Sequence, residues 1–407
     1  MNPFIDPVSP NIIPVLQLRT IDDTWLPRLK TFECGEATKA FIPFIPLLLS
    51  PKTTEIDIGF TEDTPTVVVA STIARLPKLC PDLESITLHN LPEDPIITRA
   101  VSEMLLACNR DSLQTFDVGS PLTEEAREVV YRLPELSSLW TVIQGPTSLP
   151  TVTLPNLTEI DVRYDNDLSW LQGFRGAVLG ELDSAIFRSQ SNDIGDFIGA
   201  FGSVALTTSA KDTLTEFRFY TSRSWNPNYS ALLPFNQLKV VEIEFSCKDG
   251  CCSRVDDDII MSMVRAMPKL EILQLGDAPC KTPTGITING FIGLARLCPC
   301  LSKLRIHFQV ATLVEAANSA ATLSPSDDEL VNWREDCALT DLEVGEIPTL
   351  ARSGLNLALI LLRIFPRIFN IKYTNGGWST VAETIRDFRR IGVFVQNSGI
   401  AHHPSHV

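Results

Sequence analysis

The sequence predicts an α/β solenoid, in which parallel strands form one layer and the segments that connect them, mostly helices, form the other. Three observations support this fold class: an apolar phrase that recurs about every 30 residues, an alternating pattern within that phrase, and a helical pattern between its copies. The phrase is L-x-x-L-x-L, as in "MPKLEILQLGD" (267–277), "CPDLESITLHN" (80–90) and "CPCLSKLRIHF" (298–308). No copy can bury its leucines alone, so neighbouring copies must stack.

The strands are predicted by alternation around the middle apolar residue of each phrase. Segments such as "EIDIGF" (55–60), "EIDVRY" (159–164) and "EFRFYT" (216–221) place every second residue on the same side, which is strand geometry. Successive middle positions are 21 to 38 residues apart. They are Phe32, Ile56, Ile86, Phe116, Leu139, Ile160, Ala185, Phe217, Val241, Leu273, Leu304, Leu342 and Ile371.

The helices are predicted by apolar residues at helical spacing between the strands. The pattern is found in 66–79, 123–133 and 255–267, and several of these segments open with Asp, Glu or Thr, which favour a helix N-terminus. Two apolar stretches, 40–50 and 355–365, are too short to span a bilayer, which requires a helix of roughly 20 residues. Both are expected to be buried helices.

A strand and a helix that alternate at near-constant period are typical of a leucine-rich-repeat solenoid, a horseshoe or arc with parallel concave strands and helices on the convex side. A doubly wound α/β fold also alternates strand and helix, but it does not repeat one phrase. We expect residues 1–24 to be an N-terminal segment or partial cap, 25–377 the solenoid, and 378–407 a C-terminal cap and disordered tail. Within the cap, 378–395 predicts a helix with Val381, Ile385 and Phe388 on one face and then a short apolar strand.

Composition argues against nucleic-acid and membrane partners. The chain of 407 residues has a formal net charge of −15, and an acidic protein is electrostatically mismatched to nucleic acid and to anionic lipid. The N-terminus "MNPFIDPVSP" lacks the basic and apolar regions of a signal peptide. We therefore expect an intracellular protein of the cytoplasm or nucleus.

The cysteines favour reduced, structural roles. Ten are present, and disulfides are rare in the cytosol. A zinc site would combine Cys247 and Cys251 with Cys298 and Cys300, but these spacings do not match paired C-x2-C knuckles. Cys80 and Cys298 occupy the same repeat position, where a small buried residue suffices. No metal and no cofactor are predicted.

Catalytic motifs are lacking in the sequence. It contains no G-x-S-x-G, H-E-x-x-H, Walker or dinucleotide-binding pattern. Of the five histidines, His89 and His307 lie several repeats apart and cannot share a site. The sequence therefore predicts a protein that is not an enzyme.

Polar residues between the strand leucines are expected to face the concave side and bind a protein partner. The first half of this face is predicted to be acidic and to be followed by a basic stripe, so a partner with a basic segment would be complementary. Solubility alone is an alternative reason for polar residues there. The candidate residues are Asp57, Asp117, Asp161, Arg163, Arg188, Arg218, Glu242, Glu244, Arg305 and His307.

A second candidate surface is the loop "YTSRSWNPNYSALLPF" (220–235), whose Trp225 and Tyr229 are residue types that anchor interfaces. The alternative is that both pack on the following helix.

The repeats resemble those of F-box proteins, in which a leucine-cysteine-proline turn precedes each strand, as in "RLPKLCPDLESITL" (75–88) and "LARLCPCLSKLRI" (294–306). The chain is similar over roughly 20–380 to the large F-box/leucine-rich-repeat family of mushroom-forming fungi. "LPELSSLW", "LPNLTEIDV", "TLTEFRFYTSRSWNPNYSALLPFNQLKVVEIEFSC" and "MPKLEILQLGD" carry this resemblance.

The resemblance implies a substrate-recognition region of an SCF-type ubiquitin ligase receptor, with the SCF adaptor and cullin as further partners. The F-box itself is not visible, because Trp25, Leu29 and Phe32 already read as a repeat strand. A stand-alone leucine-rich-repeat scaffold without ligase attachment is therefore the alternative.

Overall fold

The structure is a computed structural model. It describes residues 26–144, 152–165, 168–191, 196–205, 208–223, 227–245, 255–276, 285–306, 337–344, 354–373 and 378–397. Several expectations lie outside these residues: the N-terminal segment 1–24, the tail beyond 397, Trp225, His307, and the cysteines 247, 251, 252 and 280.

The described strands form a mixed α/β architecture with one 13-stranded parallel sheet, in which the strands follow one another in chain order. This order is that of a solenoid-like α/β fold, because each strand is followed by a connection and then by its own neighbour. The strands are β1 (Thr31–Ala37), β2 (Glu55–Phe60), β3 (Ser85–His89), β4 (Thr115–Pro121), β5 (Ser138–Ile143), β7 (Glu159–Tyr164), β9 (Ser184–Ser189), β10 (Glu216–Thr221), β11 (Val240–Phe245), β12 (Ile272–Leu275), β13 (Lys303–Ile306), β14 (Asp341–Val344) and β15 (Asn370–Tyr373). A second sheet contains β6 (Thr153–Leu154) and β8 (Val178–Leu179).

Helices and 3-10 turns connect the strands. The α-helices are α2 (Ile45–Leu48), α3 (Thr66–Leu79), α4 (Pro95–Ala107), α5 (Glu124–Val130), α6 (Phe197–Ala205), α7 (Ala210–Thr213), α8 (Asp257–Ala266), α9 (Ile288–Leu297), α12 (Gly354–Ile364) and α13 (Ser379–Asn397). The 3-10 turns are η1 (Ile42–Phe44), η2 (Ser169–Phe174) and η3 (Tyr229–Leu232). The apolar stretch 40–50 forms η1 and α2, and the stretch 355–365 forms α12, so the expectation of helices there is confirmed. They are not buried on all sides, because Leu355 and Leu359 of α12 are 52% and 44% exposed.

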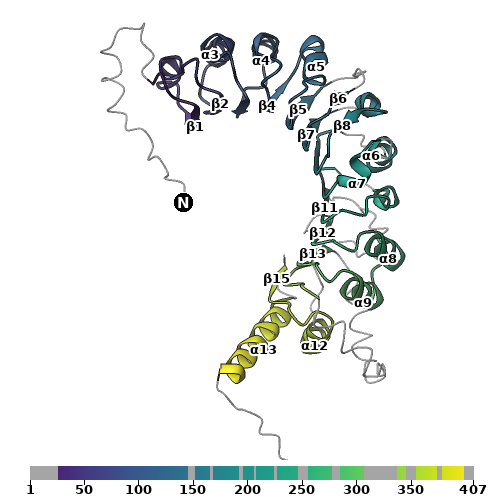
Figure 1. Cartoon of the computed structure of the whole chain (residues 1–407). Helices are drawn as coiled ribbons and strands as arrows, with labels where there is room; N and C mark the ends of the chain where they lie inside the picture. The colour runs from purple at the N-terminus through teal and green to yellow at the C-terminus, as the bar shows by residue number, and fades with distance from the viewer. Residues whose placement is uncertain are drawn as a thin grey trace, which may run out of the picture. The chain divides into compact units, whose positions relative to one another are not determined.

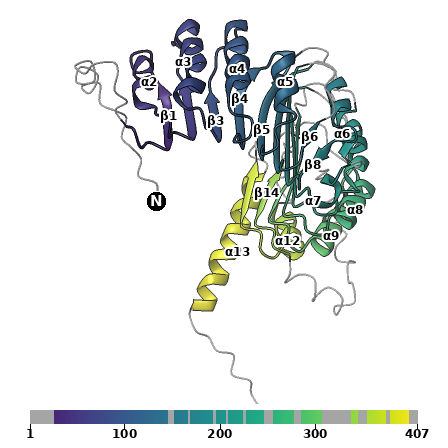
Figure 2. The same ribbon diagram turned by 45° about the horizontal axis from the view of Figure 1, so that its top comes forward.

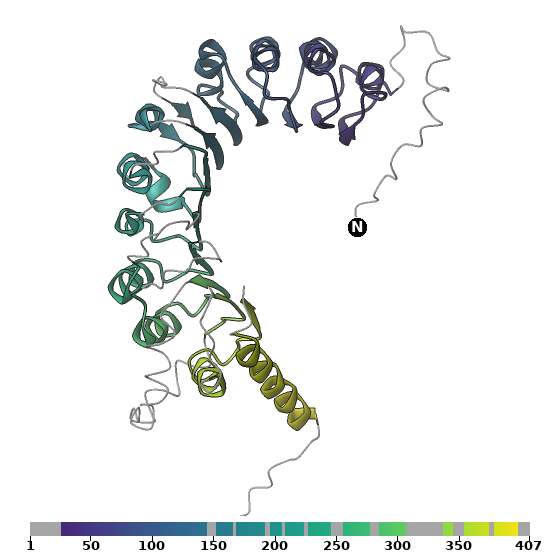
Figure 3. The same cartoon turned by 180° about the vertical axis from the view of Figure 1, so that it is seen from behind.

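The chain divides into two compact units. The first contains Met1–Phe187 and Thr207–Ala210, and the second contains Arg188–Leu206 and Lys211–Val407. In the first unit, α3, α4 and α5 all lie on one side of strands β1 to β5 (Figures 1 and 2). In the second unit, α8 and α9 likewise lie on one side of β11 to β13, as the green segments of Figure 3 show from behind.

The predicted middle apolar residues are buried in every strand of the large sheet. In the first unit, strand pairing aligns Phe32, Ile56, Ile86, Phe116, Leu139 and Ile160 into a continuous row. In the second unit, it aligns Phe217, Val241, Leu273, Leu304, Leu342 and Ile371. These rows form the seam between the strand layer and the connecting segments, so the periodicity read from the sequence is confirmed.

Helix starts follow the expected capping chemistry. Asp256 precedes α8 and accepts a hydrogen bond of 2.9 Å from the Ile259 amide. Asp94 and Thr123 cap α4 and α5 in the same way. Such side chains satisfy amide groups that have no partner within the helix.

The longer repeats hold the longer helices. Ile56 and Ile86 are 30 residues apart and enclose the 14-residue helix α3. Leu139 and Ile160 are only 21 residues apart, and Phe217 and Val241 only 24. The latter pair encloses the short turn η3 in place of an α-helix.

Bulky aromatic residues fill the space beside the short connections. In the first unit, the Trp170 ring lies 5.6 Å from that of Tyr164 and 6.0 Å from that of Phe174. In the second unit, the Phe201 ring lies 6.0 Å from that of Phe235, which follows the short turn η3. Large rings bury much apolar surface, so these contacts help to fill the core beside the short connections.

The C-terminal helix is longer than expected. The prediction that a short apolar strand follows this helix is wrong, because α13 continues through Asn397. Val381 and Ile385 are buried, as expected for the helix face, whereas the Phe388 side chain is 44% exposed.

Candidate partner-binding face

The strand register places polar side chains in rows on the sheet face that points away from the helices. Side chains alternate across a strand, so the residue after each buried middle position faces the other way. In the first unit this row, called the acidic row here, contains Glu33, Asp57, Thr87, Asp117, Trp140 and Asp161.

The acidic row carries a surplus of negative charge. Four of its six members are carboxylates, and Glu55 and Glu159 occupy exposed positions two residues earlier on β2 and β7. His89 Nε2 lies 3.5 Å from Asp57 Oδ1. Arg163 is already engaged, because its guanidinium donates to Glu93 Oε1 at 3.1 Å. The first half of the predicted face is therefore acidic, as the sequence suggested.

Trp140 lies within this row and was not among the predicted site residues. It pairs with Asp117 on β4 and with Asp161 on β7, so it has a carboxylate on each side. Its benzo ring lies against Gly119, where an added Cβ would come 2.5 Å from Trp140 Cη2. Because Gly119 has no side chain, the indole of Trp140 can occupy this space.

The second unit has an equivalent row with mixed charge, called the mixed row here. Its members in register are Arg218, Glu242, Gln274, Arg305, Glu343 and Lys372. Cations and carboxylates are close enough in this row to pair with each other.

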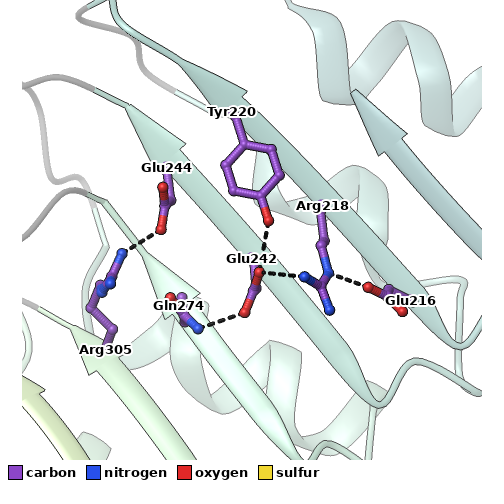
Figure 4. A network of polar contacts seen from close by, with 7 residues as sticks. All are labelled: Glu216, Arg218, Tyr220, Glu242, Glu244, Gln274 and Arg305. Atoms are coloured by element: carbon purple, nitrogen blue, oxygen red, sulfur yellow. Dashed lines mark hydrogen bonds and ion pairs between the residues drawn. The ribbon is translucent and has the colours of Figure 1, made fainter. Parts of the chain in front are cut away.

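Figure 4 shows the polar network that results. Glu242 is buried, at 7% exposure, and its carboxylate accepts from Tyr220 at 2.9 Å and from Gln274 Nε2 at 2.6 Å. Arg218 lies 3.3 Å from the same carboxylate and also pairs with Glu216. A buried carboxylate needs such partners, because its desolvation is otherwise costly.

Arg305 on β13 forms a second group of ion pairs beside this network. It pairs with Glu244 on β11 and, through Nε at 3.1 Å, with Glu343 on β14. The Arg188 guanidinium lies 5.6 Å from the centre of the Tyr220 ring, within the range of a cation–π contact. The predicted basic stripe is thus largely neutralised by its own neighbours.

The structure divides the predicted residues between two surfaces. Asp57, Asp117, Asp161 and Arg163 belong to the first unit, and Arg188, Arg218, Glu242, Glu244 and Arg305 to the second. Tyr229 does not contribute to an exposed surface, because it is 4% exposed within η3. The alternative that it packs in the interior is the one the structure supports.

Sequence reasoning missed Trp140 and Gln274 and placed Tyr220 on a loop. All three stand beside a buried strand residue at an alternating position: Trp140 follows Leu139, Gln274 follows Leu273, and Tyr220 follows Phe219. The alternation of each strand therefore marks all three positions, although none of them is charged.

A pocket of about 690 Å³ lies on the helix side, between α4 and α5. Its lining includes Arg99, Glu103, Glu124 and Glu128, and Arg99 donates to Glu103 at 2.7 Å. None of the predicted partner-binding residues lines this pocket.

The described cysteines are reduced and mostly buried. Cys80 and Cys298 follow α3 and α9 at equivalent positions, and both are fully buried. Burial raises the pKa of Cys80 to about 11 and that of Cys298 to about 12.

Over the ranges that the structure covers, no group of three or more His, Cys, Asp or Glu residues could hold a metal ion.

Within the described part of the chain, no helix has both the length and the apolar character needed to cross a bilayer.

No protein-family model and no curated protein sequence matches the chain.

Proposed function

We propose that this chain is a leucine-rich-repeat protein whose outward-facing strand surface binds a protein partner. The observation that carries the proposal is the register of the polar rows. One side of each strand is buried beneath the connecting segments, and the other presents ordered charged and aromatic side chains. Repeat proteins of this kind use such extended strand surfaces for binding.

The pairing in the mixed row supports a binding role rather than general solubility. Solvated surface charges lose side-chain entropy when they are held in one geometry, and isolated exposed pairs contribute little to stability. Here Glu242 and Gln274 are almost fully buried within the row, and the hydrogen bond from Gln274 to Glu242 holds both side chains in place. A preorganised polar surface binds with a smaller ordering cost.

The particular role that we propose is substrate recognition in an F-box-type SCF ubiquitin ligase receptor. It rests on the family resemblance of the repeats and on the leucine-cysteine-proline turns, whose cysteines are buried at equivalent positions. In this proposal the chain acts by binding and carries out no catalysis, and nucleic acid and membranes are not its partners.

The test is affinity purification of the tagged chain from a lysate of a mushroom-forming fungus, followed by mass spectrometry. Recovery of the SCF adaptor and cullin supports the ligase role. Reproducible partners without these two proteins support the stand-alone scaffold instead. No reproducible partner would contradict a binding function of either kind.

Two arginine variants assign the partner to a surface. Thr87→Arg places a bulky cation in the acidic row, between Asp57 and Asp117. Val67→Arg makes the same charge change on α3, where the side chain is 67% exposed. We expect Thr87→Arg to reduce partner recovery and Val67→Arg to leave it unchanged. Equal recovery with both variants would exclude the first unit's strand surface.

A further inference from the structure

The three aspartates of the acidic row lie on every second strand, and its fourth carboxylate, Glu33, extends the row on β1 beside Asp57. Asp57 lies on β2, Asp117 on β4 and Asp161 on β7, and one strand separates each pair in the sheet. Adjacent strands are about 4.8 Å apart, so successive members of this series lie about 9.6 Å apart along the row.

A polyproline II segment repeats at almost the same distance. It rises about 3.1 Å per residue with three residues per turn, so every third side chain returns to the same side after about 9.3 Å. A segment that crosses the strands in this conformation would place positions i, i+3 and i+6 beside Asp57, Asp117 and Asp161.

Trp140 adds an aromatic surface between the last two of these positions. It is paired in register with both Asp117 and Asp161, and its contact with Gly119 defines where the ring lies. A cation beside an indole face is attracted by the ring, and carboxylates nearby strengthen its binding. Arginine and lysine are the side chains that can use both features.

We propose that the acidic row binds a basic protein segment in an extended, polyproline II-like conformation, with Arg or Lys at every third residue and two of these side chains flanking Trp140. This inference rests on the proposed function and names the chemistry of the partner. Charge complementarity selects the occupant, because the acidic row and the chain's net charge of −15 repel nucleic acid and anionic lipid.

The test uses the full chain and three fluorescent peptides in an anisotropy titration. The first peptide has five Arg-Pro-Ser triplets. The second has the same composition with its five arginines contiguous, and the third replaces each arginine of the first with glutamate. We expect the spaced peptide to bind about tenfold more tightly than the contiguous one, a difference that equal net charge cannot produce. We expect no binding of the acidic peptide.

A matched pair of variants locates the binding. Asp117→Asn combined with Asp161→Asn removes two charges from the row, and Glu125→Gln combined with Glu128→Gln removes two from the exposed surface of α5. The first pair is expected to weaken binding of the spaced peptide about tenfold and to abolish its advantage over the contiguous one. The second pair is expected to change the affinity by less than about twofold.

Trp140 gives an independent readout if the aspartate variants do not fold. Trp140→Phe keeps an aromatic face and is expected to retain most of the affinity, whereas Trp140→Leu is expected to lower it several-fold. Equal affinities for the two variants would remove the aromatic part of the proposal.

The outcomes separate this inference from the proposed function. Equal binding of the spaced and contiguous peptides, or equal effects of the two double variants, would overturn the inference and indicate nonspecific attraction. If Thr87→Arg still reduces recovery of the cellular partner in that case, the proposed function stands and the partner uses other chemistry.

Discussion

The Tyr220 hydroxyl donates a hydrogen bond of 2.9 Å to Glu242, which lies one strand away in the sheet. Burial of the phenol, together with this bond to a carboxylate, raises the pKa of Tyr220 to about 12. The two residues are far apart in the sequence, so the folded sheet alone creates this contact.

Alkaline pH should weaken the fold through Tyr220. Because its pKa is higher in the folded chain than in the unfolded one, the protonated phenol's contribution is complete below pH 10 and is lost as the pH rises through about 12. We expect the melting temperature of Tyr220→Phe to depend less on pH over this window than that of the wild type. Parallel pH dependence of both proteins would show that Tyr220 does not titrate as inferred.

Glu242→Gln should destabilise the second unit. The substitution removes the charge that faces Arg218 and presents an amide donor to Tyr220 or Gln274, which are themselves donors there. The expected loss in free energy of unfolding is about 1–3 kcal/mol, measured by urea denaturation. Glu128→Gln on the exposed surface of α5 is the control, with an expected change within about 0.5 kcal/mol.

Gly119→Ala should displace the Trp140 ring. The added Cβ would lie 2.5 Å from Cη2 of the indole, too close for an unchanged side chain. We expect a loss of about 1–3 kcal/mol in stability. Gly35→Ala is the matched strand control, because nothing lies within 4 Å of its added Cβ.

A double-mutant cycle with Trp140→Ala checks the assigned cause. Once the ring is absent, Gly119→Ala should cost much less, and the difference measures the coupling between the two positions. An unchanged cost would place the strain in the backbone of β4 instead.

Leu304→Ala should be severely destabilising. Leu304 is fully buried and stands in register between Leu273 and Leu342, so truncation leaves a cavity inside the repeat seam. The expected loss is about 2–5 kcal/mol in denaturant unfolding. Leu355→Ala, at a position 52% exposed, should have a far smaller effect. Similar losses at both positions would contradict the assigned seam.

Native alkylation should distinguish the described cysteines. Cys300 is exposed, whereas Cys108 and Cys298 are buried and burial raises the pKa of each to about 12. Because the thiolate is the reactive form, a brief iodoacetamide treatment should label Cys300 and spare the other two. Peptide mass spectrometry measures the labelling, and denatured protein provides the fully labelled control. Rapid native labelling of Cys298 would contradict its burial.

Much of the architecture could be predicted because it depends on local periodicity. A residue such as Leu273 must be apolar at a fixed position of each repeat, and this requirement is visible in the sequence wherever the phrase recurs. The bounds of β2, β7 and β10 therefore agree with the segments predicted for them. The end of α13 could not be predicted in this way, because "IGVFV" has the apolar content of either a helix or a strand.

The candidate surface could be predicted only in part, because acidic residues at the same position of different repeats acquire different environments in the sheet. Asp57 and Glu242 follow strand residues at corresponding repeat positions, yet Glu242 is buried among Tyr220, Gln274 and Arg218. Their neighbours come from adjacent strands, separated by repeats of unequal length. The sequence position of an acidic residue does not reveal whether a cationic side chain will lie beside it.

The sequence by itself determined the repeat, the order of strand and helix, the buried seam and the acidic character of the first unit's strand surface, because each depends on spacing within one repeat. The tertiary structure decided which charges are paired, that Trp140 lies between Asp117 and Asp161, and that Gly119 makes room for it. These features depend on side chains from different strands that meet only when the parallel register is formed.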